Sequence, residues 1–146
     1  MDELAFLEEA RRMCPRYVRH DVTAHEDDSL CAMVEDKGMG HYGLYWLLVE
    51  LLTSRKGHIY DLSDQRGWKR LAYDLSCMTD VSVPKCKAFV KDLYDYGLIS
   101  TEHFDEGMLA IKRVLRDSES YAQYVAKKKY GAWKTNQKKR DAKQDA

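Results

Sequence analysis

Two groups of neighbouring histidine and carboxylate residues are the features of this sequence that most resemble a metal site, in residue type and spacing. His20 directly precedes Asp21, and His25 stands before three acids at 26–28. A metal site needs further histidine, cysteine or carboxylate ligands that converge on one point. Neither group supplies them, so we interpret the acids at 26–28 as charges that complement the dipole at a helix start.

Cysteines and glycines give no stronger indication of catalysis. The four cysteines form no Cys-x-x-Cys pair, and the apolar neighbours of three of them predict buried thiols in a reducing compartment. Cys77, Cys86 and His103 lack the spacing of a zinc site. The glycines in residues 38–43 spell G-x-G-x-x-G, yet a helix and not a strand is expected before them. We therefore expect a protein that is not an enzyme and needs no metal or cofactor.

Lysines and arginines form the other candidate site, one for nucleic acid. The chain is neutral overall, but residues 127–146 carry eight basic and two acidic side chains, which leaves them at +6 and the rest at −6. Basic side chains are the groups that contact phosphates, and these contacts dominate affinity for nucleic acids. The candidate residues are Arg66, Lys69, Arg70, Lys85, Lys87, Lys91, Lys127, Lys128, Lys129 and Lys134.

Acidic side chains beside these positions argue against a strong site. Asp92 and Asp95 share a predicted helix with three of the lysines, and further acids lie at 102–106. Because carboxylates repel phosphate, the alternative interpretation is that the lysines are ordinary solvated residues. Tyr130 and Trp133 alternate with lysines in the tail, which suits stacking on single-stranded bases. The alternative for these two aromatic side chains is docking on the protein core.

An apolar helix at 40–54 is the element on which the others are expected to pack. Its sequence at 40–52, GHYGLYWLLVELL, repeats leucine and tyrosine at helical spacing and is the most apolar stretch of the chain. Such a helix should be buried on most sides. Before it we expect an amphipathic helix at 2–13, a strand-like segment at 16–23 and a second helix at 26–37.

Two capped helices are expected after the apolar helix. Ser63 or Asp64 can cap a helix that reaches Leu75, and Ser82 can cap one that reaches Tyr96. Each has apolar residues at helical spacing on one side and charged residues on the other. The candidate cations on these helices are therefore expected to face solvent.

A β-ribbon and a last helix complete the predicted elements. Strands at 98–101 and 108–111, joined by a turn at 103–107, form the ribbon, and a strand at 58–60 can pair with it. A helix from Ser118 to Trp133 follows, and the residues after it are expected to be solvated or disordered. The inner face of this helix is expected to comprise Tyr121, Tyr124, Val125 and Lys128.

The order of these elements predicts the fold class. We expect a mostly helical α+β protein, a winged helix-turn-helix with extra N-terminal helices and a C-terminal helix. The paired helices would form the helix-turn-helix, and the ribbon would form the wing. The predicted division is an amphipathic helix at 1–15, a winged-helix domain at 16–115, and a C-terminal helix with a basic tail at 116–146.

Four short motifs carry a family resemblance. They are YVRHD at 17–21, GHYGLYW at 40–46 with the acid Glu50 after it, LAYDL at 71–75 and LYDYGLI at 93–99. In these the chain resembles the N-terminal domain typified by a pair of Listeria prophage proteins. It is similar in turn to phage replisome-organiser and DnaD-like replication-initiation modules. The resemblance implies a phage or prophage winged-helix domain that binds DNA in replication initiation.

Two functions of different classes remain open from the sequence. One is DNA binding, to duplex or single strands, together with replication proteins. The other is a protein-interaction or dimerisation module that does not bind DNA, which the acidic remainder of the chain favours. Self-association would use the helix at Asp2–Met13. An acidic N-terminus and the lack of any apolar run long enough to span a bilayer predict a cytoplasmic protein without membrane contact.

Overall fold

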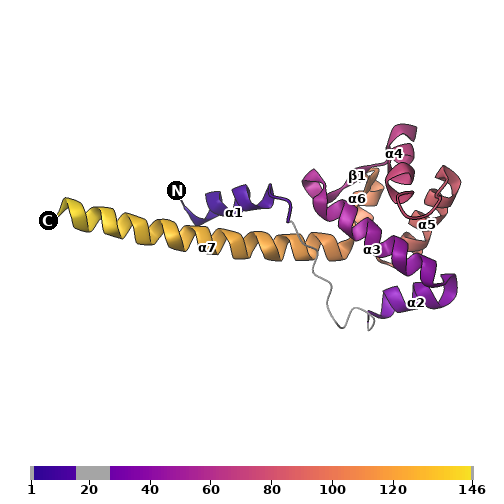
Figure 1. Cartoon of the computed structure of the whole chain (residues 1–146), viewed down its shortest axis with the longest axis horizontal. Helices are drawn as coiled ribbons and strands as arrows, with labels where there is room; N and C mark the ends of the chain where they lie inside the picture. Colours follow the sequence, from indigo (N-terminus) through magenta and orange to yellow (C-terminus); the bar gives the residue numbers. More distant parts are fainter. Residues whose placement is uncertain (1, 16–26, 146) are drawn as a thin grey trace.

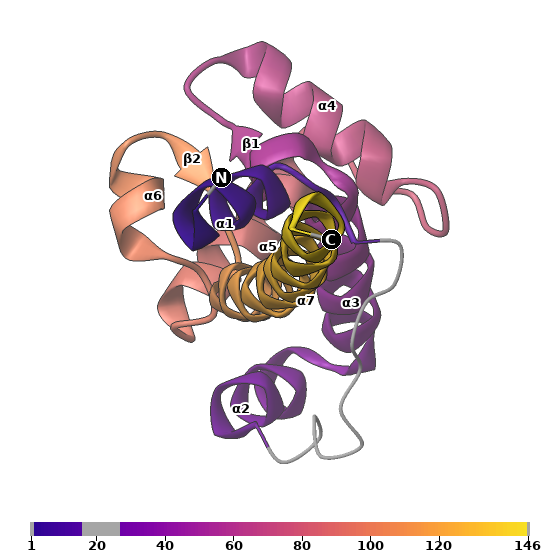
Figure 2. The same ribbon diagram turned by 90° about the vertical axis from the view of Figure 1, so that its left-hand side faces the viewer.

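The computed structural model describes residues 2–15 and 27–145, and it consists of a helical body at one end of a long helix (Figure 1). The helices of the body are α2 (Asp28–Lys37), α3 (Met39–Ser54), α4 (Gln65–Leu75), α5 (Val83–Asp95) and α6 (Thr101–Asp105). The long helix is α7 (Lys112–Gln144), and α1 (Glu3–Arg11) packs beside it outside the body. Figure 2, which looks along α7, shows α1 against one side of it. The segment predicted as strand-like, 16–23, lies outside the described residues.

The main core is built around α3, as its apolar sequence predicted. Tyr45, Leu48 and Leu52 of this helix are at most 1% exposed. α2, α4 and α7 all pack against α3. Leu75 of α4 and Leu93 of α5 are buried in the same cluster, so the helical spacing of apolar residues correctly identified the inner faces of both helices.

Side-chain caps determine where the paired helices begin. Asp64 accepts a hydrogen bond from the backbone N–H of Gly67 at 3.1 Å, and Ser82 accepts one from Lys85 at 3.3 Å. Each cap satisfies a backbone donor that the first helical turn leaves without a partner. The predicted starts of α4 and α5 are therefore confirmed.

A small antiparallel sheet links the segments on either side of the helix pair. β1 (Tyr60–Asp61) pairs with β2 (Met108–Leu109), and Ile99 forms a separate bridge with Ile111. The expected pairing between the strand near residue 60 and the returning strand is confirmed, although β1 begins two residues later than predicted. The prediction of a full strand at 98–101 was wrong, because only the bridge at Ile99 remains there.

A short helix, α6, stands where a turn was predicted at 103–107. The Ser100 hydroxyl accepts a hydrogen bond from the backbone N–H of His103 at 3.4 Å and lies 2.7 Å from His103 Nδ1. A serine in this position is a helix cap. Gly107, with φ +81°, then allows the chain to leave the helix and enter β2. Capping by Ser100 is the local signal that the ribbon prediction overlooked.

α7 extends beyond both ends of the helix predicted at 118–133. It begins at Lys112 because Val114 belongs to the main core and no glycine or proline interrupts the chain before Ser118. It continues to Gln144 through residues predicted to be solvated or disordered, most of which are lysine, glutamine, arginine or alanine, all good helix formers. The polar composition of the residues after Trp133 therefore predicted their exposure to solvent correctly, but the prediction of disorder was wrong.

The face of α7 predicted to point inward was also wrong. Tyr121 and Tyr124 are 40% and 62% exposed. Lys128 is exposed as well, and only Val125 is partly buried. The fully buried residues of this stretch are Ala122 and Ala126, whose small side chains give only a weak hydrophobic pattern.

The cysteines differ from their predicted burial. Cys86 of α5 is buried, and burial raises the pKa of its thiol to about 11. Cys14, Cys31 and Cys77 are exposed. Cys14 and Cys77 follow the ends of α1 and α4, and Cys31 lies on the outer side of α2. Apolar neighbours in the sequence therefore did not predict burial of these three thiols.

Two glycines within helices give opposite expectations for substitution by alanine. A Cβ atom on Gly67 would lie 1.8 Å from the carbonyl oxygen of Asp61, because the first turn of α4 passes directly over β1. A Cβ atom on Gly131 of α7 would meet nothing within 4 Å. We expect Gly67→Ala to lower the free energy of unfolding by about 2 kcal/mol or more. Gly131→Ala should raise it by up to about 1 kcal/mol.

Urea unfolding followed by circular dichroism measures both changes. Effects of the same sign and size at the two positions would contradict the close approach of α4 to β1.

Candidate nucleic-acid interface

The contact between α1 and α7 determines which side chains of α7 face outward. Phe6 and Ala10 of α1 pack on Ala122 and Ala126 of α7, and none of the four is more than 8% exposed. This cluster is separate from the main core. The short alanine side chains allow the two helices to approach closely. α1 thereby covers the alanine side of α7, and the lysines of α7 remain exposed to solvent together with Tyr121 and Tyr124.

Two aromatic residues extend this cluster along α7. The ring centroid of Phe6 lies 5.9 Å from that of Tyr130 and 6.3 Å from that of Trp133, and the two α7 rings stack at 6.0 Å. Both side chains are partly buried. The aromatic residues of the tail are therefore docked against α1, at a place other than the core that the sequence suggested.

An ion pair holds the other end of α1. Arg11 Nε donates to the two carboxylate oxygens of Glu119 at 3.2 and 3.0 Å, and Nη2 donates at 2.7 Å. This two-pronged arrangement is stronger and more directional than a single contact. The hydrogen bonds from Arg11 are the main reason that the pKa of Glu119 is lowered.

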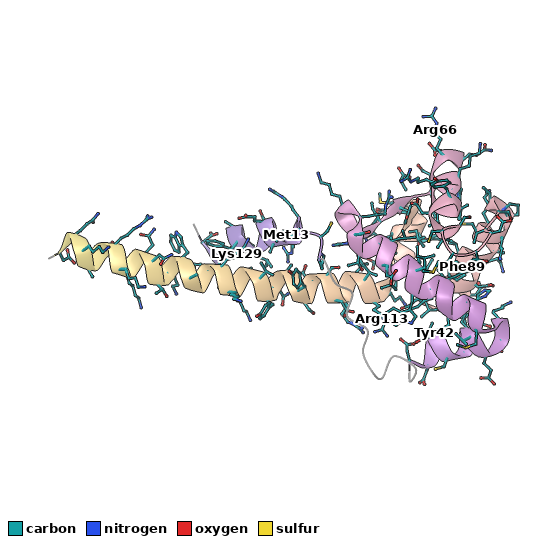
Figure 3. All side chains as sticks on the ribbon, viewed as in Figure 1. Met13, Tyr42, Arg66, Phe89, Arg113 and Lys129 are labelled. Carbon is teal, nitrogen blue, oxygen red and sulfur yellow. The ribbon has the colours of Figure 1, made fainter. Side chains whose placement is uncertain are left out.

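Basic side chains cover the outward surface of α7. Residues 121–140 contain seven lysines and arginines and no acid. The exposed members of the predicted site are Lys127, Lys128, Lys129 and Lys134. Lys129 lies beside Met13, with Nζ 4.0 Å from Sδ (Figure 3). The stretch from Lys127 to residue 140 spans about 20 Å of helix, so the positive charge is presented along a rod.

The predicted cations of α4 and α5 lie at the other end of the molecule, and two of them are paired with acids. Arg70 Nε is 3.3 Å from the carboxylate of Asp74, and Lys91 Nζ is 3.1 Å from that of Asp95. The Lys91–Asp95 pair is exposed and therefore weak, whereas the Asp74 carboxylate is largely buried; both acids reduce the positive charge of this surface. The acids of α6 at 102–106 add to that reduction.

The remaining cations of this helix pair differ in their surroundings. Arg66 projects from the first turn of α4 (Figure 3), and Lys69 is exposed on the same helix. Lys85 Nζ lies 3.3 Å from the backbone carbonyl oxygen of Asp80. The structure therefore divides the predicted site into two groups, one on α4–α5 and one on α7, separated along the long axis of the molecule (Figure 1).

One acid that counted against the site turns away from it. The carboxylate of Asp92 lies 2.9 Å from His41 Nε2 and 3.7 Å from Lys37 Nζ. These contacts join α5 to α2 and α3. Asp92 therefore helps to position α5 in the body, and Lys37 offsets part of its charge.

A second carboxylate holds α4 in place. Asp74 accepts a hydrogen bond from the hydroxyl of Tyr60 at 2.8 Å, and Arg55 Nη1 lies 4.0 Å from the same oxygen. The guanidinium of Arg55 also lies over the Tyr60 ring, 3.9 Å from its centroid. Burial first, and the bond to Asp74 second, raise the pKa of Tyr60. The end of α3, β1 and α4 are thus joined through one acid.

A groove above α5 contains aromatic residues that were not assigned to the site from the sequence. Its volume is about 400 Å³. Trp68 of α4, Tyr94 of α5 and Phe104 of α6 line it together with Lys87 and Lys91. One sequence feature could have indicated this groove: two lysines and a tyrosine stand at i, i+4 and i+7 of one helix, which puts them on one face. No local sequence pattern indicated that Trp68 of α4 and Phe104 of α6 would line the same groove.

Side chains that could bind a metal ion do not cluster in the part of the chain that the structure describes. No group of three or more histidine, cysteine, aspartate or glutamate side chains there is arranged to hold a metal ion. The pair at 20–21 lies outside the described residues. None of the described helices combines the length and hydropathy needed to cross a bilayer.

A family model described as Lin1244/Lin1753-like, N-terminal, matches residues 17–114. The chain belongs to this family. No curated protein and no solved structure matches it. In this Lin1244/Lin1753-like chain the family region includes α2 to α6 and the first residues of α7. α1 and the lysine-bearing part of α7 lie outside that region.

The Arg11–Glu119 ion pair gives the contact between α1 and α7 a pH dependence. The folded state favours the charged carboxylate, so its stabilising effect is present above the ordinary glutamate pKa of 4.5 and is lost as the pH falls through the lowered pKa of Glu119. We expect α1 to detach more readily in acid, and Glu119→Gln to remove this part of the pH dependence. The indole NMR signal of Trp133, which packs against Phe6, reports the contact.

Glu9→Gln, on the exposed side of α1, is the charge-matched control and should retain the wild-type pH dependence. An unchanged pH dependence of the Trp133 signal in Glu119→Gln would refute the role of the ion pair.

Proposed function

We propose that this chain is a non-enzymatic DNA-binding module and that the lysine-bearing side of α7 provides its main contact with phosphate groups. The observation that carries this proposal is the charge of α7 between residues 121 and 140, with seven basic side chains and no acid. Because α1 covers the apolar side of α7, these side chains are directed to solvent. Contacts between such cations and phosphates dominate affinity for nucleic acid.

The α4–α5 pair is the second proposed contact, as the helix-turn-helix of a winged-helix domain. In a helix-turn-helix the second helix of the pair enters the major groove. α5 would take this role, and the sheet of β1 and β2 would serve as a small wing. Arg66, Lys69 and Lys85 supply positive charge to this surface, whereas the acids that pair with Arg70 and Lys91 make it the weaker of the two contacts.

The motif resemblance to replisome-organiser and DnaD-like modules supports a role in phage or prophage replication initiation. Such a role would place the protein in the cytoplasm beside other replication proteins. The rival function is protein interaction without DNA binding, which the charge of −6 on residues 1–126 favours. Self-association through the segment Asp2–Met13 would use its exposed apolar residues, Leu4 and Met13, which are 57% and 41% exposed.

Removal of three lysines from α7 tests the main contact. We expect Lys127→Gln, Lys128→Gln and Lys129→Gln, combined in the full chain, to weaken DNA binding. The slope of log affinity against log salt concentration should become shallower by up to about three, since each phosphate contact contributes about 0.9. Fluorescence anisotropy of labelled DNA at several salt concentrations measures both quantities.

The matched variant is the combination of Lys85→Gln, Lys87→Gln and Lys91→Gln on α5, which removes the same charge. Wild-type affinity and slope in the α7 variant would contradict the proposal. Absence of DNA binding by the unaltered chain would favour the interaction-module alternative.

Neutralisation of one acid tests the contact through α5. Asp95 pairs with Lys91, so Asp95→Asn should release that lysine and strengthen DNA binding. We expect a gain of about threefold, because a single exposed charge contributes less than about 1 kcal/mol. Glu50→Gln, an exposed acid on α3, changes the net charge equally and should have less effect. Equal gains in the two variants would indicate a response to net charge alone.

A further inference from the structure

The groove above α5 is lined mainly by apolar and aromatic side chains. Val90, which is 1% exposed, contributes from α5, and Trp68 and Phe104 line it from α4 and α6. Tyr94 packs against Phe104 with ring centroids 5.4 Å apart, yet 41% of Tyr94 remains exposed. A volume of about 400 Å³ falls within the range of small-molecule sites. The groove therefore offers flat, partly accessible rings to a planar ligand.

Two lysines stand beside these rings. Lys87 Nζ lies 5.5 Å from the centroid of the Trp68 ring, and Lys91 is paired with Asp95 at 3.1 Å. Both lysines line the groove on the same face of α5. Aromatic rings beside cations, in an open groove, are the combination with which proteins bind single-stranded nucleic acid, because bases stack on the rings while phosphates contact the cations.

We propose that this groove binds an unstacked nucleobase of single-stranded DNA. The base would stack on Trp68 or Tyr94, and the phosphates next to it would contact Lys87 and Lys91. The proposal rests on the proposed DNA-binding function and adds a strand preference to one of its contacts. Duplex DNA keeps its bases paired and stacked, so it cannot fill the groove without loss of pairing energy.

The charge of the groove favours a nucleotide over a peptide as its occupant. An apolar peptide side chain would use the rings but would leave two lysines against one carboxylate at its edge. A nucleotide would contact both the rings and the lysines, since its base is apolar on its faces and its phosphate is an anion. Lys87 is exposed and has a flexible side chain, so it can move from the Trp68 ring towards a phosphate when the base enters.

Single substitutions in the groove test this proposal in the full chain. We expect Trp68→Leu and Tyr94→Leu each to weaken binding of an oligothymidylate of about 15 nucleotides by about 5- to 150-fold, the range expected for loss of one base–aromatic stack. Binding of duplex DNA should change by less than about twofold. The control is Tyr73→Leu, because Tyr73 is an exposed tyrosine of α4 that does not line the groove.

A second measurement covers the case in which a substitution disturbs folding. Ultraviolet cross-linking of the unaltered chain to the oligothymidylate, followed by peptide mass spectrometry, should place cross-links on Trp68, Tyr94 or Phe104. Cross-links confined to α7, together with wild-type single-strand affinity of Tyr94→Leu, would overturn the groove proposal and leave DNA binding through α7 intact. No binding to either form of DNA would overturn both proposals and point to a protein ligand for the groove.

Discussion

Coverage of the apolar side of α7 by α1 is the interaction on which the form of this molecule depends. An isolated helix with seven cations and no acid between residues 121 and 140 would be held together weakly, since like charges repel and helix nucleation is costly. Burial of Phe6 on Ala122 and Ala126 contributes about 1.5–3 kcal/mol for the phenylalanine side chain alone. The stacked pair of Tyr130 and Trp133 extends the contact towards the basic end.

This packing arrangement also determines the charge distribution. Because α1 uses the apolar side of α7, the lysines are left on the surface, while the acidic excess stays in the remainder of the chain. The molecule therefore has a lysine-rich helix at one end, with the acids Glu3, Glu8 and Glu9 of α1 beside it, and a body of mixed charge at the other. A polyanion such as DNA would be attracted first to the lysines of α7. The helical body would then be close to the DNA, and α5 could contact a base or the edge of the major groove.

Helix boundaries in the body were predictable because their signals are local. Asp64 and Ser82 each contact a backbone N–H three residues ahead, so the sequence alone contains both partners of each bond. Ser100 caps α6 by the same kind of local contact, with the N–H of His103, but the apolar residues on either side of it favoured a strand in the prediction.

Other features depended on contacts that no local pattern contains. The inner face of α7 is set by Phe6, more than 100 residues away in the sequence, and two alanines gave no hydrophobic signal strong enough to compete with Tyr121 and Tyr124. The groove above α5 likewise needs side chains from three helices. Candidate cations were identified correctly as exposed, yet their separation into two distant groups and their pairing with acids followed only from the fold.

Hydrogen–deuterium exchange of the full chain, with and without DNA, reports directly on whether α7 provides the main contact with DNA. We expect slower exchange on DNA binding along residues 127–140 of α7, with a smaller effect at α5 and none at the side of α2 remote from both. DNA-dependent protection confined to the body, with α7 exchanging as it does in the unbound protein, would contradict that role of α7.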